Sequence, residues 1–453
     1  MRWLRPHRVE KALTPDLCVI GAGAAGCAAA LTGAALGAAT VVIEAVSPGG
    51  ARVAFDAPFA VWRAAARRRA EGGGGTDWAE IAARGRAAAA RAQASCSAER
   101  LKAAGVRVIQ GHARFVAPDA VSVGGVAVAA RRFVVATGRA PLSPTLPGLE
   151  LLRPLTPADA LALTEIPARL AILGAGATGL ALAQTLTRLG ARVVVVDQGP
   201  ALRELPREFA DPALRRLRSE GVEIREGVAP TGIEPVGAAG AARLLLPGGE
   251  TIDASHVLVA AGWRANVEGL GLESTGAAFG PDGLGARGDL RSAARRIFAA
   301  GGVVKGAAPD AEGAARMGKL AARSALLGLP GDARLDAAAE IWPLDPAVAR
   351  LGLDRHPEDG ARGGLRALRA TFGEDDEALA AGRREGHLAL SLDAKGKLVG
   401  ATLVGPDIGA AAAALSLALA RGPDAATLAE APLPGLGRLA AAARALGAEQ
   451  ARR

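Results

Sequence analysis

The stretch "DLCVIGAGAAGCAAALTGAALGAATVVIE", Asp16 to Glu44, decides how the N-terminal part of the chain folds. A short apolar run leads into glycines at G-x-G-x-x-G spacing, and a second apolar run, "TVVIE", ends in an acid. This order predicts a strand, a glycine turn, a helix and a second strand, the Rossmann fingerprint of a dinucleotide site. The first glycine permits the tight turn, the second lets the backbone approach a pyrophosphate, and the third lets helix and strand pack closely. Glu44 is placed to accept hydrogen bonds from a ribose diol.

The same stretch has a second interpretation as a membrane helix or a signal peptide. No charged residue occurs from Leu17 to Ile43, and the basic leader "MRWLRPHRVEK" precedes it. Against this, the segment is mainly Ala and Gly, is interrupted by glycines, and follows Asp16 directly. We therefore predict a Rossmann unit and no membrane span.

The unit recurs later in the chain as "RLAILGAGATGLALAQTLTRLGARVVVVD", which begins at Arg169. Asp197 ends its second strand, at the same distance from the last glycine as Glu44. Two dinucleotide sites in one chain imply transfer between two cofactors, and two structural units without ligands are the alternative. An acid at Asp197 favours NADH over NADPH, because it would repel a 2′-phosphate.

Length and charge bound the remaining possibilities. A chain of 453 residues exceeds what one core usually organises, so we expect several domains. The net charge of +9 comes mostly from Arg, and the basic run Arg63–Arg69 has no interleaved aromatic residues. We predict a solvated helical face there and no nucleic-acid partner.

The three cysteines, Cys18, Cys27 and Cys96, are too few for a disulfide framework and match no zinc spacing. They indicate a reducing compartment, which we expect to be the cytoplasm. Cys18 and Cys27 fall in the first strand and helix and are predicted to be small core residues.

Histidines give no catalytic candidate. We interpret His112 and His256 as structural, and His7, His356 and His387 as solvated or turn-associated.

Eight segments of the chain match, in the same order, segments of a known protein family. They are "CVIGAGAAG", "GHARF" (Gly111 to Phe115), "FVVATG", "LGAGATGLALAQTLTRLGARVVVV", "LPRE" (Leu205 to Glu208), "LVAAGWRANVEGLGLE", "RIFAAGG" (Arg296 to Gly302) and "GKLVGATLVGP" (Gly396 to Pro406). In these segments the chain resembles the pyridine nucleotide-disulfide oxidoreductases, in particular the dihydrolipoamide dehydrogenase and mercuric reductase branch.

The resemblance implies an α/β fold with two Rossmann-like domains, for FAD and NAD(P), and a C-terminal α+β dimerisation domain, hence a homodimer. The expected FAD domain spans 14–148 and 267–330, the NAD(P) domain 149–266, and the dimerisation domain 334–453. "RRFVVATGRAPLSPTLPG" (131–148) and "SHVLVAAGWRAN" (255–266) are the expected crossings between domains. Within the last domain, "HLALSLDAKGKLVGATLV" predicts a hairpin. The apolar helix 410–420 then packs either against a partner or within its own chain.

The expected cofactors are FAD and NAD(P)H, with NADH favoured. The expected FAD contacts are Gly21, Gly23, Ala24, Ala25, Gly26, Glu44, Gly49, Gly50, Ala113, Ala136, Thr137, Gly138 and Gly301. The expected NAD contacts are Gly174, Gly176, Ala177, Thr178, Gly179, Asp197 and Gly262. We predict no metal site.

The family's redox chemistry is missing from the segment "GGARVAFDAPFAV", Gly49 to Val61, which we interpret as a loop opened by a glycine turn. The family has G-G-x-C-x-N-x-G-C-x-P-x-K here, and Arg52 and Ala57 occupy the two cysteine positions. Val61 replaces the lysine near the flavin, and Ala181 replaces its glutamate partner. A carboxylate left without its cation would be costly, so this loss is paired.

Two further family positions differ. Gly435 and Arg438 stand where the C-terminal acid/base motif has Thr and Glu. Gly302 stands where an Asp holds a ribityl hydroxyl, a loss of about 1.5–3 kcal/mol in binding.

Two functions remain open. One is an FAD-dependent oxidoreductase that passes electrons from NADH through flavin to an unknown acceptor without a disulfide relay, with Arg52 either stabilising reduced flavin or merely exposed. The other is a non-catalytic family member that serves as a nucleotide-binding or structural partner. In neither case do we expect lipoamide, glutathione or mercuric reductase activity.

Overall fold

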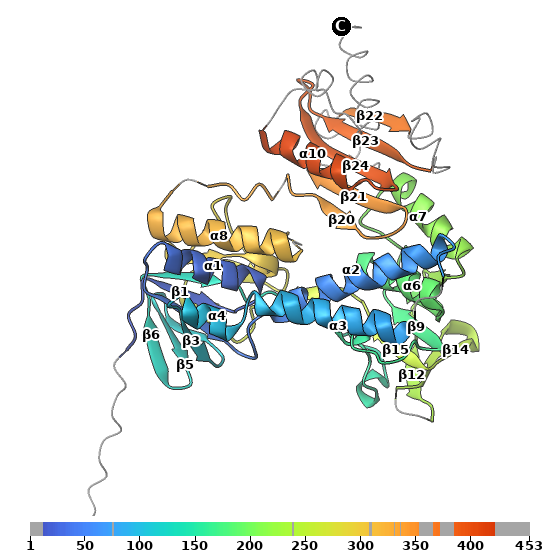
Figure 1. Ribbon diagram of the computed structural model, residues 1–453, viewed down its shortest axis with the longest axis horizontal. Helices are drawn as coiled ribbons and strands as arrows, with labels where there is room; N and C mark the ends of the chain where they lie inside the picture. The colour runs from blue at the N-terminus through green and yellow to red at the C-terminus, as the bar shows by residue number, and fades with distance from the viewer. Residues whose placement is uncertain are drawn as a thin grey trace, which may run out of the picture. The chain divides into compact units, whose positions relative to one another are not determined.

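The protein is described by a computed structural model that covers two compact units (Figure 1). It describes residues 12–74, 77–237, 240–307, 310–329, 331–335, 337–352, 366–371 and 385–421, with the backbone alone for 51–53 and 366. The first unit comprises 1–64, 77–142 and 263–333, and the second comprises 65–76, 143–262 and 334–453.

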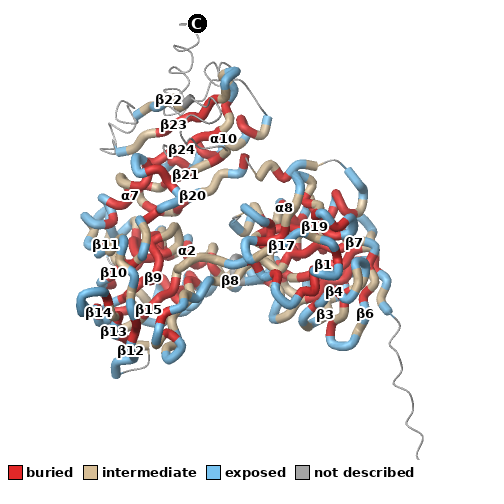
Figure 2. Tube along the Cα trace, turned by 180° about the vertical axis from the view of Figure 1, so that it is seen from behind, coloured by how far each residue is buried: buried red, intermediate tan, exposed pale blue. Residues whose placement is uncertain are grey.

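The first unit is built on a five-stranded parallel sheet in the order β19-β7-β1-β2-β3. Its strands are β1 (Leu17–Ile20), β2 (Thr40–Glu44), β3 (Arg107–Gln110), β7 (Arg132–Val135) and β19 (Ile297–Ala299). The near-continuous apolar runs of β1 and β7 are buried (Figure 2), as expected of parallel strands covered on both faces. The segment Leu17 to Ile43 is therefore strand, helix and strand, as predicted, and not one long helix.

Two helices, α1 (Ala24–Ala35) and α8 (Ala311–Leu327), lie side by side on the sheet (Figure 1). Their backbones touch, because a Cβ on Gly318 would lie 2.0 Å from the carbonyl oxygen of Ala25. An antiparallel meander, β4 (Arg114–Ala117), β5 (Ala120–Val123) and β6 (Val126–Ala129), packs on the sheet through the rings of Phe115 and Phe133.

The segment after β2 is helical, so the loop interpretation of Gly49 to Val61 was wrong. Only Gly49 and Gly50 form the turn, with φ of +119° and +71°. Helix α2 begins at Gly50 and runs to Ala70, including Pro58. The Ala and Arg residues that dominate its second half are strong helix formers, which explains the result. The basic run Arg63–Arg69 lies in this helix, with Arg68 and Arg69 exposed, as predicted.

Helices α3 (Trp78–Ala94) and α4 (Ala98–Ala103) follow in the first unit. The indoles of Trp62 in α2 and Trp78 in α3 pack edge to face, with ring centroids 4.7 Å apart. The described part of the first unit also contains four short strands: β8 (Arg139–Pro141), β16 (Trp263–Ala265), β17 (Phe279–Gly280) and β18 (Gly283–Leu284). Strand β16 pairs with β8 (Arg139–Pro141), so the two segments in which the chain passes between units are hydrogen-bonded to each other.

The second unit repeats the strand order of the first in a parallel sheet β11-β10-β9-β15. Its strands are β9 (Arg169–Leu173), β10 (Arg192–Asp197), β11 (Glu223–Glu226) and β15 (His256–Val259). The helices are α5 (Pro157–Ala160), α6 (Ala177–Leu189) and α7 (Arg207–Ser219), and a meander is formed by β12 (Gly232–Pro235), β13 (Ala242–Leu245) and β14 (Thr251–Ala254). The repeat seen in the sequence is thus a repeat in topology. Single 3₁₀ turns occur in the second unit at η1 (Leu149–Leu151) and η2 (Pro247–Gly249), and in the first unit at η3 (Leu272–Ser274) and η4 (Gly301–Val303).

The second unit also contains an antiparallel sheet in the order β20-β21-β24-β23-β22, covered by α10 (Gly409–Arg421). Its strands are β20 (Glu340–Trp342), β21 (Ala347–Gly352), β22 (Arg366–Thr371), β23 (His387–Leu392) and β24 (Leu398–Gly405). The predicted hairpin is present, with its turn at Asp393–Gly396. The predicted helix packs within its own chain through Ala412 and Leu415, while Leu417 remains 63% exposed.

We had expected His387 to be solvated or turn-associated, and this prediction was wrong. His387 opens strand β23. Its ring lies half-buried against Phe209 of α7, with centroids 4.7 Å apart. Burial lowers the pKa of His387, and the facing carboxylate of Glu208 opposes that effect. His7 and His356 lie outside the described residues.

A buried ion network joins α6 to the segment before β21. The guanidinium of Arg188, 7% exposed, lies 2.6 Å from Glu220 and 2.9 Å from Asp345. Gln184 donates a further hydrogen bond to the Asp345 carbonyl at 2.8 Å. The network is fully paired, as a buried charge requires.

Candidate dinucleotide sites

In the glycine turn of the first unit, two of the three glycines are packed against backbone atoms and the third is not. A Cβ on Gly21, where φ is +99°, would lie 2.5 Å from the Ala136 carbonyl oxygen. A Cβ on Gly26 would lie 1.8 Å from the Gly21 carbonyl oxygen. Gly23 differs, because its φ of −75° suits any residue and its Cβ would meet nothing nearer than the Gly50 Cα at 3.9 Å. The fold therefore requires glycine at the first and third positions but not at the second.

Glu44, at the end of β2, is fixed by backbone groups of the turn. One carboxylate oxygen accepts the N–H of Ala22 at 2.6 Å and the other accepts the N–H of Val46 at 2.9 Å. An ionised carboxylate has about four acceptor sites. Two of them are thus occupied by backbone donors, and the half-exposed group retains capacity for a diol.

The other predicted FAD residues lie at the same edge of the sheet, beyond the carboxyl ends of its strands, where open α/β sheets bind ligands. Ala136 follows β7 and donates its N–H to Ile20 at 2.8 Å, and Gly49 donates to Ala22 at 2.8 Å. Gly301 follows β19 with φ of +80°, and a Cβ there would lie 2.9 Å from that of Ala25. The rest of the set lies beside these positions: Ala24 in α1, Ala113 after β3, and Thr137 and Gly138 after Ala136.

The second unit builds the same turn from its own residues. A Cβ on Gly174, where φ is +115°, would lie 2.4 Å from the Ala260 carbonyl oxygen, and one on Gly179 would lie 2.2 Å from that of Gly174. Gly176, with φ of −81°, has nothing within 4 Å of its Cβ position. Asp197 repeats the role of Glu44.

The carboxylate of Asp197 accepts the N–H of Ala175 and that of Gly199, each at 2.8 Å. Ala177 and Thr178 open helix α6 above this turn, and Gly262 follows β15 with φ of +124°. All the predicted NAD residues therefore lie around the turn or the strand end beside it.

Sequence reasoning missed Arg139, which lies beside Gly302. A Cβ on Gly302 would lie 3.2 Å from Cγ of Arg139 and 3.4 Å from its Cδ and Nε. The guanidinium lies 5.6 Å from the ring centroid of Trp263. Arg139 and Gly302 lie far apart in the sequence, and nothing in either local motif signals their contact.

Helix α2 holds the positions at which the resemblance places redox cysteines. Arg52 lies in its first turn, and Ala57 and Val61 are half-buried further along it. Ala181 is fully buried in α6. Gly435 and Arg438 lie outside the described residues.

All three cysteines of the chain are free thiols, buried in the first unit. Cys18 and Cys27 are 0% and 1% exposed in β1 and α1, as predicted. Burial raises the pKa of Cys18 to about 12, which keeps it protonated. Among the predicted structural histidines, His112 is exposed and His256 opens β15, its Nδ1 lying 3.2 Å from the Ser255 hydroxyl.

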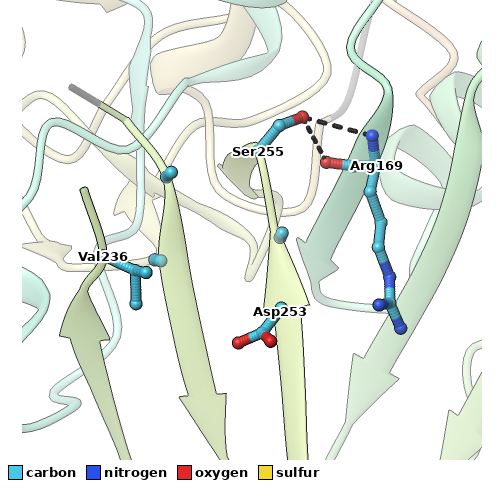
Figure 3. Close-up of a pocket in the computed structure, with 7 residues that line it drawn as sticks. Arg169, Val236, Asp253 and Ser255 are labelled. Atoms are coloured by element: carbon cyan, nitrogen blue, oxygen red, sulfur yellow. Dashed lines mark hydrogen bonds between the residues drawn. The ribbon is translucent and has the colours of Figure 1, made fainter. Parts of the chain in front are cut away.

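A separate hollow of about 240 Å³ lies in the second unit between β9 and the meander (Figure 3). Arg169, Val236, Asp253 and Ser255 line it, and the Ser255 hydroxyl donates to the Arg169 carbonyl at 2.7 Å. Arg169 opens β9, whereas the glycine turn follows its other end. The hollow is thus not the dinucleotide site.

Among the described residues, no group of three or more His, Cys, Asp and Glu side chains is placed to hold a metal ion. None of the helices in the described part of the chain is long and apolar enough to cross a membrane.

Two Rossmann units with matching turns and acids define a protein with two dinucleotide-binding folds. The family model described as pyridine nucleotide-disulphide oxidoreductase matches residues 15–318. The chain is 31% identical to a dihydrolipoyl dehydrogenase of Thermus scotoductus over 434 residues, which are 90% of this chain and 92% of that protein. It therefore belongs to the pyridine nucleotide-disulphide oxidoreductase family, which is FAD-dependent and uses NAD(P)H.

Other relatives agree in part. A mercuric reductase of Bacillus cereus is 30% identical over 253 residues, 55% of this chain and 40% of that enzyme, so the match spans less than half of its length. The crystal structure of LpdA from Mycobacterium tuberculosis matches with a TM-score of 0.81 at 25% identity, over 97% of this chain and 100% of that one.

Proposed function

We propose that the protein oxidises NADH and passes the electrons through bound FAD directly to an acceptor, without a disulfide relay. FAD would supply the centre that accepts a hydride and releases electrons. The chain's own residues would bind and orient the two dinucleotides, one in each unit. The acceptor is a small molecule or a protein.

The observation that supports two bound dinucleotides is the open space at Gly23 and Gly176. Both have ordinary backbone angles, and a Cβ on either would meet no atom closer than 3.9 Å, so an alanine would be accommodated. A glycine that the fold does not need is explained by a ligand that approaches the backbone closely. The N–H groups of the following helix would then face a pyrophosphate.

The acids fit the ribose end of each ligand. Glu44 and Asp197 each keep acceptor capacity beyond their two backbone hydrogen bonds. A 2′-phosphate next to Asp197 would meet a like charge, which favours NADH over NADPH. Arg203 lies near this turn, with Nη1 3.8 Å from the Cβ position of Gly199. The comparison of NADH with NADPH is therefore a direct test of which charge dominates.

The positions of the cysteines support electron transfer without a disulfide relay. A disulfide relay needs two thiols next to the flavin, and all three cysteines of the chain lie in β1, α1 and the segment after α3 instead of in α2. We also propose a homodimer, by analogy with the family, in the cytoplasm, where free thiols persist.

The test is to purify the protein and record its spectrum before and after anaerobic addition of NADH. A yellow protein that NADH bleaches faster than NADPH supports the proposal. A colourless protein that takes up no added FAD refutes it.

A second function is favoured by one observation, the side chain of Arg139 in the space beside Gly302. In the family this is the position of an Asp that holds the flavin's ribityl chain. If that change prevents flavin binding, the protein is a non-catalytic partner that binds a nucleotide in its second unit alone. A colourless protein that binds NADH would support this function.

A further inference from the structure

Two cysteines that the proposed reaction does not use lie against each other behind the first glycine turn. Cys27 belongs to α1, and Cys96 lies between the end of α3 and Ser97, which caps α4. The Cys27 sulfur lies 3.5 Å from the Cys96 carbonyl oxygen, and the two side chains interact. Both are almost fully buried, at 1% and 7% exposure, and both belong to the first unit.

The two sulfurs differ in their charge state. The hydrogen bond from Cys27 lowers the pKa of Cys96 to about 7, against the effect of burial, and the Ser95 hydroxyl and the charge of Arg100 add to it. The pKa of Cys27 is raised, because its thiol donates to Cys96 and is buried. Near neutral pH a substantial fraction of Cys96 is therefore thiolate, next to a Cys27 thiol that stays protonated.

The internal repeat shows that the fold does not require a thiol at Cys27. The corresponding residue of the second unit, directly after the third glycine, is Leu180, which is also fully buried. An aliphatic side chain thus satisfies the same place behind the same turn. The segment that carries Cys96 follows α3, and the second unit has no counterpart to it among its described elements.

We propose that Cys27 and Cys96 form a redox-sensitive dithiol that a peroxide oxidises to an intramolecular disulfide. The Cys96 thiolate attacks a peroxide oxygen, the O–O bond breaks, and Cys96 becomes a sulfenic acid while hydroxide takes up a proton and leaves as water. The Cys27 sulfur then loses its proton and attacks the Cys96 sulfur, forming the S–S bond and releasing a second water. Two thiols are oxidised, and hydrogen peroxide is reduced to two waters.

Oxidation would act directly on the glycine turn. The Cys27 sulfur lies 3.1 Å from the Ala22 carbonyl oxygen of the turn, and its movement into a disulfide would alter that contact. A disulfide requires sulfurs about 2.05 Å apart, so it would tie residues 95–97 to α1. The end of α3 also lies beside the Gly49–Gly50 turn, since a Cβ on Gly49 would lie 3.4 Å from Cγ of Gln93. The dithiol thus couples an oxidant to the geometry of the first dinucleotide site.

The experiment maps the bond without any assumption about the cofactor. The folded protein is treated with hydrogen peroxide and then unfolded, its remaining thiols are blocked with N-ethylmaleimide, and the tryptic peptides are analysed by mass spectrometry. Cleavage after basic residues leaves Cys96 on peptide 92–100, and Cys18 and Cys27 together on peptide 12–52. We expect these peptides linked, with a loss of two hydrogens, and fragment ions that assign the link to Cys27 and the maleimide to Cys18.

Cys18→Ser should leave the link intact, and Cys96→Ser should abolish it. The wild-type map alone decides the matter if a variant does not fold. Wild-type protein in which peroxide converts Cys96 to sulfinic or sulfonic acid while Cys27 stays reduced would overturn the proposal, as would three thiols that all remain free.

A second measurement tests the hydrogen bond between the thiols. The rate at which iodoacetamide alkylates Cys96 should rise with pH with a midpoint near 7. Cys27→Ala removes the donor and should move the midpoint toward that of a free cysteine, about 8.5, whereas Cys27→Ser keeps a donor and should leave it near the wild-type value. An unchanged midpoint in Cys27→Ala would refute the pairing.

Discussion

Exchanging each turn acid for its amide, by Glu44→Gln and Asp197→Asn, should separate the two dinucleotide sites. Each carboxylate accepts two backbone N–H bonds, at 2.6 and 2.9 Å in the first unit and at 2.8 Å twice in the second. An amide has one acceptor oxygen, so it cannot accept both backbone N–H groups and also a ribose hydroxyl, and one hydrogen bond from the ligand to a charged group is lost. Such a bond contributes about 1.5–3 kcal/mol, which corresponds to about 10- to 100-fold in affinity.

Because the sites lie in separate units, each variant is the control for the other. Glu44→Gln should weaken FAD binding by about this factor and leave NADH binding within about twofold, and Asp197→Asn should do the reverse. Calorimetric titration of the flavin-free protein with FAD and with NADH measures both, and circular dichroism checks the fold. If both variants weaken the same ligand, or if folded variants bind both ligands as the wild type does, the assignment of one site to each unit is wrong.

Four further predictions concern stability and activity. Gly318→Ala should destabilise the protein by about 1–3 kcal/mol in denaturant titrations, because the added Cβ meets the backbone of α1, whereas Lys319→Ala on the exposed face of α8 should change it by less than about 0.5 kcal/mol. Arg188→Met should lower the free energy of unfolding by about 3–5 kcal/mol in the same measurement, since it leaves two carboxylates of a largely buried network without their shared cation. A decrease below about 1 kcal/mol, as for an exposed ion pair, would contradict this. His387 has a lowered pKa in the folded protein, so the unfolded chain binds the proton first as pH falls through about 6.5 and the unfolding free energy decreases; His387→Phe should flatten that decrease. Lipoamide, glutathione and Hg²⁺ should not be reduced above the rate of free FAD, and measurable turnover of any of them would show that a relay exists.

The parts of the site that the sequence predicted are those fixed by local sterics. Gly26 must lack a Cβ because the Gly21 carbonyl oxygen would lie 1.8 Å from it, and Gly21 has φ of +99°, so both constraints follow from the strand-turn-helix geometry itself. The same geometry placed Glu44 and Asp197 beside their turns. Such short-range requirements leave a pattern in the sequence, so the two strand-turn-helix-strand units and their turns could be predicted.

The parts that could not be predicted depend on contacts between distant segments. Arg139 meets Gly302 only because β7 and β19 are neighbours in the sheet, and Cys27 meets Cys96 only because the end of α3 returns to α1. The helix from Gly50 was missed for a different reason. The family pattern indicates where redox cysteines would lie but not that the segment is helical. The Ala-rich and Arg-rich composition of the second half of α2 does favour a helix.

The glycines also weigh against a purely structural role for both units. If the turns served only the fold, the first and third glycines would suffice, because they alone would clash with backbone. Gly23 and Gly176 have φ of −75° and −81°, which alanine adopts readily, and alanine would lose less conformational entropy on folding. A structural unit would gain from losing these glycines, whereas a unit that binds a pyrophosphate would lose its close approach. Both glycines are present together with both acids, so the second unit bears the marks of a binding site as fully as the first. A non-catalytic role would therefore still have to account for a second glycine in each unit that the fold does not need.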